Sequence, residues 1–263
     1  ILKSSDRGNS WKAMVNGLPE RGSVYCIAQD HKNPNLLFCG TEFGFYFTTD
    51  GGENWVTLKN GLPTIAVRDI AIQSRENDLA IATFGRGFYI LDNYSMLQNL
   101  QKEDFEAKSK IYPVKNGLVF TESTPLGHRG ESFQGSSFFT APNPPIGVHF
   151  DVWVKDDEKT LRELRKDREK EAEEKGKSIA YPSVEELRKE DTEEESFILC
   201  RIEDMQGNVV RKLKLPAKKG MKRVWWDGRY APVEPINFRN FDPSNVYDEP
   251  ERGFPAVPGD YQV

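Results

Sequence analysis

The residues Thr48-Thr49-Asp50-Gly51-Gly52-Glu53-Asn54-Trp55 repeat the pattern of Ser4-Ser5-Asp6-Arg7-Gly8-Asn9-Ser10-Trp11, and both fit hydroxyl, any, Asp, any, Gly, any, any, Trp. The agreement continues, because Asn60-Gly61-Leu62-Pro63 follows the second Trp at the distance at which Asn16-Gly17-Leu18-Pro19 follows the first. The period of the repeat is 44 residues. Periods of this order, built from short strands and turns, are typical of β-propeller blades and similar arrays.

Each copy of the phrase predicts a tight turn with a structural role. An Asp at the start of such a turn accepts hydrogen bonds from the backbone N–H groups that follow, the Gly permits a positive φ, and the hydroxyl adds a local hydrogen bond. The Trp supplies a large flat surface to pack against the neighbouring repeat. The residues with this structural role are Ser4, Asp6, Gly8 and Trp11 in the first copy and Thr48, Asp50, Gly52 and Trp55 in the second.

The repeated phrase resembles the Asp box, or BNR repeat, of sialidases, sortilin-type receptors and some endoglucanases. The resemblance implies that Asp6 and Asp50 lie in turns between the third and fourth strands of two blades. It also implies that these turns lie on the side of the propeller away from the substrate.

Alignment of the two repeats predicts three strands in each. We expect them at residues 24–29, 36–41 and 45–48 in one repeat and at 67–72, 79–83 and 88–91 in the next. Ile1 falls where a third strand should lie, and no further box follows Tyr94. Because propellers close with about four to eight blades, we expect residues 1–95 to be terminal blades of a longer protein, with its remaining blades as partners.

The composition allows two domains and excludes several kinds of partner. The chain has 263 residues, 37% of them hydrophobic, and a net charge of −5. Residues 155–195 contain 16 acidic and 11 basic side chains and account for that charge, so the remainder offers no basic field for nucleic acid. No apolar run has the length of a transmembrane segment, and the N-terminus lacks a signal-peptide pattern.

The cysteines and histidines predict neither a metal site nor a cofactor. Cys26, Cys39 and Cys200 contain no C-x-x-C pair, and none of the three histidines stands at a ligand spacing from a cysteine. Cys26 and Cys39 fall on adjacent predicted strands, where they are either buried free thiols or a disulfide.

The texture of the sequence changes after Tyr94. Residues 96–145 are expected to be an extended connector, with a short helix in 95–105, an extended run at 111–121 and many prolines and glycines. A second domain is expected at 146–263. Its strands are predicted at 149–154, 197–203, 208–215, 221–227 and 261–263. Short strands with polar turns favour an immunoglobulin-like β-sandwich.

Three phrases of this second domain carry a further resemblance. They are Gly207-Asn208-Val209-Val210-Arg211, the run from Gly220 to Arg229, and Pro258-Gly259-Asp260-Tyr261. In this order and spacing they resemble the FlgD-like Ig module of bacterial secreted proteins. Together with the Asp boxes, the chain is similar to the C-terminal part of large exported bacterial proteins described as sortilin-like or BNR-repeat glycosyl hydrolases. That resemblance implies an extracytoplasmic location: periplasmic, cell-surface or secreted.

A charged insertion, residues 156–195, separates the first two strands of the predicted sandwich. Thr160 with Glu163, and Ser183 with Glu186, match the capping-box pattern, so each pair predicts the start of a helix, and Gly176 ends the first one. The insertion is either a solvated helical hairpin or a pair of helices that docks a partner.

Four residues near the end of the chain have two interpretations, namely Trp225, Trp226, Asp227 and Arg229. One Trp in the core, with Asp227 and Arg229 holding the next loop by hydrogen bonds, is a structural role. A polar grip on a glycan, with a Trp as stacking platform, is the functional alternative.

No set of acid, base and nucleophile is recognisable, so no catalytic residue is assigned. Arg68 and Arg86 are the candidate ligand-binding residues, because each lies in or just beyond a strand where propellers gather their ligands. The alternative for Arg86 is an exposed position in the tight turn of Phe84-Gly85-Arg86-Gly87.

Two functions follow. In the first, the chain is a non-catalytic end piece that completes a propeller and supplies an Ig-like docking or spacer module, for binding a glycan or a cell-envelope protein. In the second, it is part of a glycoside hydrolase, sialidase-like or endoglucanase-like, whose catalytic carboxylates lie mostly upstream. The second requires an Asp or Glu of these blades within roughly 5 to 10 Å of another carboxylate.

Overall fold

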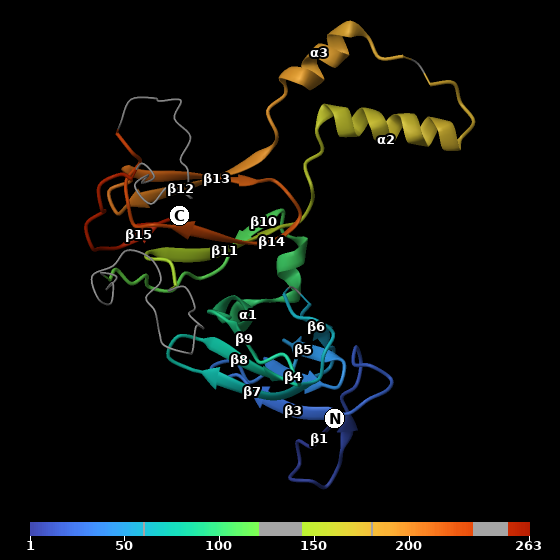
Figure 1. The fold of residues 1–263 in the computed structure, drawn as a ribbon, viewed down its shortest axis with the longest axis vertical. Coiled ribbons are helices and arrows are strands. Elements are labelled where there is room, and N and C mark those ends of the chain that lie inside the picture. Colours follow the sequence, from blue (N-terminus) through green and yellow to red (C-terminus); the bar gives the residue numbers. More distant parts are fainter. Residues whose placement is uncertain (60, 121–143, 180, 234–251) are drawn as a thin grey trace. The chain divides into compact units, whose positions relative to one another are not determined.

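The protein has two compact units, residues 1–106 and residues 107–263 (Figure 1). The computed structural model describes residues 1–59, 61–120, 144–179, 181–233 and 252–263. Both units consist mainly of antiparallel strands, which confirms the predicted mainly β fold.

The first unit contains three antiparallel sheets. One pairs β1 (Leu2–Lys3) with β2 (Lys12–Ala13). The second has the order β3 (Val24–Gln29), β4 (Leu37–Thr41), β5 (Gly44–Thr48), β6 (Val56–Thr57), and the third the order β7 (Val67–Gln73), β8 (Asp78–Thr83), β9 (Phe88–Leu91). The six strands predicted from the repeat are all present, with ends that differ by no more than one residue.

Strand pairing follows the sequence repeat. Leu2 pairs with Ala13 in β1 and β2, and Tyr46 pairs with Thr57 in β5 and β6. Each residue of the second pair lies 44 residues after its counterpart in the first pair, the same distance that separates the two Asp-containing phrases. The sheet β1–β2 therefore corresponds to the outer half of the sheet β3–β6.

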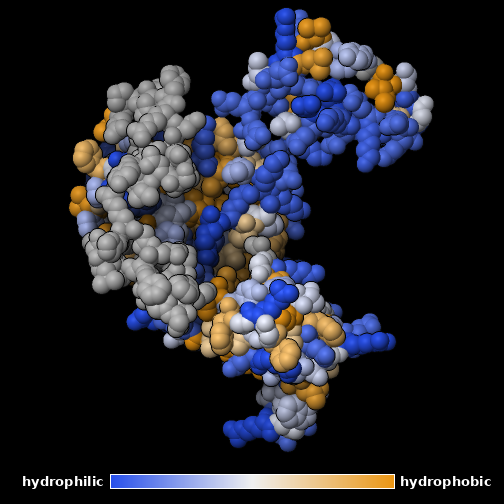
Figure 2. Space-filling view, viewed as in Figure 1, coloured by the Kyte–Doolittle hydropathy of each residue, from blue (hydrophilic) through white to orange (hydrophobic). Residues whose placement is uncertain are grey.

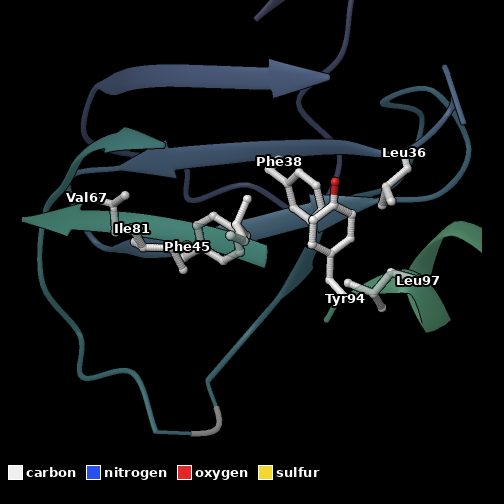
Figure 3. Packing of buried hydrophobic residues seen from close by; sticks show 8 residues of the cluster. Leu36, Phe38, Phe45, Val67, Ile81, Tyr94 and Leu97 are labelled. Carbon is white, nitrogen blue, oxygen red and sulfur yellow. The ribbon is translucent and has the colours of Figure 1, made fainter. Parts of the chain in front are cut away.

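The sheets β3–β6 and β7–β9 share one hydrophobic core (Figure 3). Phe38 stacks on Phe45 with ring centroids 5.9 Å apart, and Tyr94 meets Phe38 edge-on at 5.2 Å. Val67, Leu79 and Ile81 of the third sheet complete the contact, with Leu36 and Leu97 at its margin. Burial of these side chains is the main force that holds one sheet on the other.

The segment after β9 is attached by a buried carboxylate. Asp30 accepts hydrogen bonds from the Tyr94 hydroxyl at 2.6 Å and from the Gln98 side chain at 2.9 Å. Burial raises the pKa of Asp30, but these bonds and those from the Lys32 and Asn33 N–H groups outweigh it and hold the pKa below its usual range. Asp30 thus fixes this segment to the end of β3.

The helix predicted at 95–105 is divided in two. Helix α1 (Ser95–Asn99) ends at Leu100, whose backbone is extended, and a 3₁₀ helix (Lys102–Glu106) follows. The prediction was correct in kind and too long in extent, because one extended residue is enough to interrupt the hydrogen-bond ladder.

The described residues of the second unit form two three-stranded antiparallel sheets. One has the order β10 (Ser109–Ile111), β11 (Val148–Val154), β14 (Gly220–Trp226), and the other β13 (Val209–Pro216), β12 (Phe197–Asp204), β15 (Tyr261–Gln262). The five predicted strands are present within one residue at each end. β10 is an addition, formed by residues expected to belong to the connector.

Among its described residues, two groups of buried side chains form the core of this unit. Phe150, Val152 and Val154 of β11 meet Val224 of β14 and Cys200 of β12 in the first group. Ile202, Val210 and Trp226 form the second. Since both groups take residues from both sheets, the sheets pack face to face.

The charged insertion forms two helices, α2 (Leu161–Glu174) and α3 (Val184–Thr192). Both predicted capping boxes are present: the Thr160 and Ser183 hydroxyls accept hydrogen bonds from the N–H groups of Glu163 and Glu186, and the two Glu side chains bond back. The visible surface of the helices is mostly hydrophilic (Figure 2).

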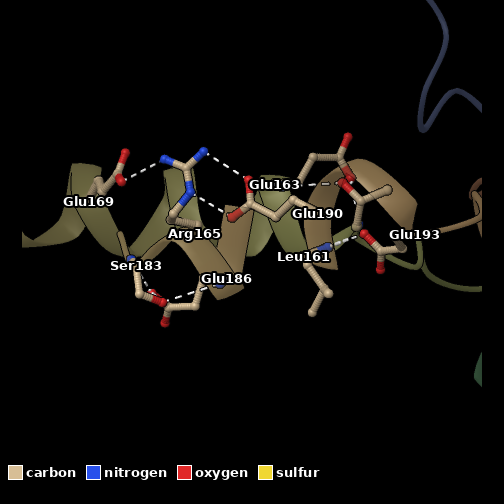
Figure 4. Close-up of polar contacts among 9 residues, drawn as sticks. Leu161, Glu163, Arg165, Glu169, Ser183, Glu186, Glu190 and Glu193 are labelled. Carbon is tan, nitrogen blue, oxygen red and sulfur yellow. Dashed lines mark hydrogen bonds and ion pairs between the residues drawn. The ribbon is translucent and has the colours of Figure 1, made fainter. Parts of the chain in front are cut away.

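One arginine joins the two helices (Figure 4). Arg165 of α2 donates two hydrogen bonds to the Glu190 carboxylate of α3, at 2.7 and 2.9 Å, and a third to Glu169 at 2.7 Å. No apolar residue of α2 or α3 is buried. Polar contacts, rather than apolar packing, therefore dominate the link between these helices.

Candidate functional site

The Asp-containing turns use their carboxylates to fix their own backbone. In the second copy the Thr48 hydroxyl donates to Asp50 at 2.6 Å and accepts from the Gly52 N–H at 3.2 Å, while Asp50 accepts from the Asn54 N–H at 2.9 Å. Gly52 has a φ of 98°, which favours glycine. Burial raises the pKa of Asp50, but the hydrogen bonds outweigh it and lower the pKa below its usual value.

The first copy has the same internal geometry. Ser4 donates to Asp6 at 2.8 Å and accepts from the Gly8 N–H at 2.7 Å, and Asp6 accepts from the Ser10 N–H at 2.8 Å. Hydrogen bonds from Ser10 and Ser4 lower the pKa of Asp6 to about 2. Because its hydrogen bonds are made within the turn, each Asp has a structural role that accounts for its place in the repeat.

The two tryptophans of the repeated phrase differ in environment. Trp55 is 4% exposed, and its indole N–H donates to the Met14 carbonyl of the preceding repeat at 3.2 Å. Trp11 is 62% exposed and donates to the Gly8 carbonyl of its own turn at 3.1 Å. Of these two tryptophans, Trp55 is the one whose indole N–H bonds to another repeat within the described residues.

Arg68 packs against two aromatic rings. Its guanidinium carbon is 4.0 Å from the ring centroid of Tyr25 in β3 and 5.1 Å from that of Phe84, which follows β8. Its side chain is exposed and has no hydrogen-bond or ion-pair partner among residues whose placement the structure describes. The structure therefore brings together a cation and two rings that are distant in the chain, since Tyr25 precedes Arg68 by 43 residues and Phe84 follows it by 16.

Arg86 lies in the turn that begins at Phe84. Gly85 and Gly87 on either side have φ values of 80° and 71°, and Arg86 is exposed. The two candidate binding residues are thus linked through Phe84, which contacts Arg68 and precedes Arg86 by two residues. Both arginines are candidates from the sequence, whereas Tyr25 and Phe84 are added by the contacts that they make with Arg68.

In the second unit, Trp226, Asp227 and Arg229, at and after the end of β14, hold the loop that follows this strand. Trp226 is 5% exposed, meets Tyr261 edge-on at 5.0 Å and donates to the Arg229 carbonyl at 2.9 Å. Asp227 accepts from the Arg229 N–H at 3.1 Å, and the Arg229 side chain donates to the Gly253 carbonyl at 3.0 Å. Trp225 stacks on His149 at 5.2 Å. These contacts favour the structural interpretation over a glycan grip.

The cysteines and acidic residues form no site in the described parts of the chain. Cys26, Cys39 and Cys200 are free thiols there, and burial raises the pKa of Cys39 to about 12. No group of three His, Cys, Asp or Glu side chains among the described residues is arranged to hold a metal ion. None of the described helices has the length and apolar character needed to cross a membrane.

Comparison with known proteins gives one weak structural similarity. No family model and no curated protein matches the sequence. Among solved structures, the chain is similar to the crystal structure of an ancestral GH74 enzyme, with 24% identity over 32% of this chain and 11% of that one. The TM-score is 0.29, so this similarity to a glycoside hydrolase carries no argument about fold or activity. The match spans about a tenth of that enzyme's length.

Proposed function

We propose that residues 1–106 are sheets of a β-propeller of the Asp-box type, and that their function is to dock further sheets of the same kind without catalysing a reaction. The supporting observation is a difference between two equivalent phenylalanines. Phe45 in β5 is 1% exposed, and Phe88 in β9 is 78% exposed.

The strand register makes these two residues equivalent. Phe45 pairs with Gly40, which pairs with Cys26, and Phe88 pairs with Ala82, which pairs with Asp69. Each phenylalanine therefore occupies the same position in the third strand of its sheet, on the same face. Phe45 is covered by the sheet β7–β9, whereas nothing in the described residues covers Phe88.

The uncovered surface is a whole sheet face, here called the open face. Cross-strand partners point to the same side of a sheet, so the register places the following residues on it: Asp69, Ala71, Ala80, Ala82, Phe88 and Ile90. Ile90 is 58% exposed. The positions of the preceding sheet that correspond to this open face, such as Phe38 and Phe47, belong to the shared core. A repeat that cannot bury such a face alone gains stability by stacking on a neighbour.

The proposed role of residues 107–263 is an Ig-like, FlgD-like module that spaces or docks the array. Two packed antiparallel sheets with a common core support this assignment. A bacterial, extracytoplasmic location and a glycan or cell-envelope protein as partner are the corresponding proposals. The non-catalytic role is proposed because the sequence contains no recognisable set of acid, base and nucleophile.

Self-association of the purified chain tests the docking role. Burial of an exposed Phe contributes about 1.5 to 3 kcal/mol, so two open faces are expected to meet at high concentration. Sedimentation equilibrium should show association that Phe88→Asp abolishes. Phe254→Asp is the matched control, because Phe254 is 71% exposed and lies in the second unit. A chain that stays monomeric, or one in which both variants behave alike, would contradict the proposal.

A further inference from the structure

The first strand of each full sheet in the first unit contains a β-bulge at the same place. In β3, Val24 pairs with Thr41 and Cys26 with Gly40, so Tyr25 is the extra residue. In β7, Val67 pairs with Thr83 and Asp69 with Ala82, so Arg68 is the extra residue. A bulge redirects the side chain of its unpaired residue, and bulges are frequent beside binding sites.

Tyr25 and Arg68 are therefore equivalent residues of successive sheets, and they touch. The Arg68 guanidinium carbon lies 4.0 Å from the Tyr25 ring centroid. The ring of Phe84, in the turn after β8, also contacts this guanidinium, with its centroid 5.1 Å from the guanidinium carbon. Stacking between rings reduces the freedom of the guanidinium while its N–H groups, which lie at the edge of its plane, stay available to a ligand.

The same end of the two sheets is rich in exposed rings and in cationic groups. The Glu42 and Phe84 N–H groups donate to the Ser23 and Ala66 carbonyls, which places both turns beside the starts of β3 and β7. Phe84 is 66% exposed and Tyr25 is 38% exposed. Arg86 adds a second exposed cation in the turn after β8.

The acidic groups of this region do not neutralise Arg68. Glu42 accepts a hydrogen bond from the Ser23 N–H at 3.3 Å. Asp69 accepts one from the Ile70 N–H at 2.9 Å and pairs with Ala82, which places it with the open face. Neither forms an ion pair with Arg68 in the part of the chain that the structure describes.

We propose that Arg68, held against the rings of Tyr25 and Phe84, binds the carboxylate of an acidic saccharide such as a uronic acid. A guanidinium fork matches the two oxygens of a carboxylate, and one rigid fork suits one carboxylate per sugar residue. The exposed ring surface next to it provides an apolar wall against which the sugar packs. An acidic peptide would supply the negative charge, but it lacks a sugar ring to pack against the exposed aromatic surface.

The site requires only β3, β7 and the turn after β8, all present in this chain, so it does not depend on the docking of further sheets. If the self-association experiment failed, the proposed carboxylate site at Arg68 would be unaffected. If the carboxylate site were absent, the proposed docking role would be unaffected.

Titration calorimetry on the full chain tests the site with trigalacturonate, the uncharged trisaccharide of the same linkage and a triglutamate peptide as probes. Trigalacturonate should bind and the uncharged sugar should not. Arg68→Gln should weaken binding about tenfold or more, because a charge-assisted hydrogen-bond pair is lost. Arg68→Lys should restore little of it, since a lysine cannot present the fork.

Arg75→Gln is the matched control. Arg75 is an exposed arginine of the turn between β7 and β8, paired with Glu76 at 3.1 Å, and its loss should leave binding unchanged. Far-ultraviolet circular dichroism of each variant verifies folding, and Phe84→Ala, which should also weaken binding, provides a second variant. The proposal is overturned by absence of trigalacturonate binding at millimolar concentration, by equal binding of the uncharged sugar, by binding of the peptide alone, or by unchanged affinity in Arg68→Gln.

Discussion

Truncation of Phe45 and of Phe88 to alanine should have very different costs, although the two residues hold the same position in successive sheets. Both lie in a third strand, and their partners in the second strand are Gly40 and Ala82. Because the strand positions are equivalent, the intrinsic preference of alanine for a strand contributes similarly to both variants. The difference between them isolates the contact of one sheet with another.

The magnitude follows from burial. Phe45 is 1% exposed, and removal of a buried Phe ring costs about 3 to 5 kcal/mol from lost apolar contact and the cavity left behind. Phe88 is 78% exposed, and surface substitutions lie within about 0.5 kcal/mol. The two variants should therefore differ by at least about 2.5 kcal/mol, or more than roughly fifty-fold in the unfolding equilibrium of the first unit.

Native-state hydrogen exchange is the appropriate assay, because a chain with two units does not give a single two-state transition. Peptides that cover β4 and β8 report the opening of the first unit, and peptides that cover β11 and β12 serve as an internal control in the second. Measurement at low micromolar concentration keeps the open face free of self-association. A cost below about 1 kcal/mol for Phe45→Ala, or equal costs for both variants, would refute the packing argument.

Two further predictions concern polar contacts. The pKa of Asp30 is lowered in the folded state, so its contribution to stability is full above the unfolded pKa of about 4 and is lost as the pH falls through the folded value. Asp30→Asn should therefore be less stable near neutral pH and should flatten the acid limb of the stability profile. Hydrogen exchange in β3 and β4 measures this, and an unchanged acid limb would contradict it. Arg165→Met should raise the hydrogen-exchange rates of α2 and α3 without affecting β12 and β13, because Arg165 bridges the helices through Glu190. Lys166→Met is the control, and equal effects of the two variants would contradict the bridging role.

The features that the sequence predicted best are those whose hydrogen bonds close within a few residues. The two Asp turns span residues that are at most four apart, as in the bond from the Asn54 N–H to Asp50. The capping boxes at Thr160 and Ser183 close over three residues. Such contacts depend on local residue types and spacing, so they are visible before any neighbour is known.

The aromatic setting of Arg68 was not predicted. A signal was present, since alignment of Val24-Tyr25-Cys26 with Val67-Arg68-Asp69 puts the two bulge residues at one position. The bulge itself has no residue pattern at these sites, because an extra residue in a strand is defined by its partner strand and not by its own side chain. Its contact with Phe84 depends further on where the turn after β8 lies.

The amino-acid sequence alone determined the period of 44 residues, the strands that it contains, the Asp turns and the helix starts, because each rests on bonds or alternation along a short stretch of chain. It assigned the same role to Trp11 and Trp55, and its alignment of strands 45–48 and 88–91 put Phe45 and Phe88 at the start of equivalent strands. Only the tertiary structure separated the members of each pair, with Trp55 and Phe45 buried and Trp11 and Phe88 exposed. Burial is a property of what packs against a residue, so matching positions acquire different environments when, within the described residues, a sheet packs on one of them and not on the other.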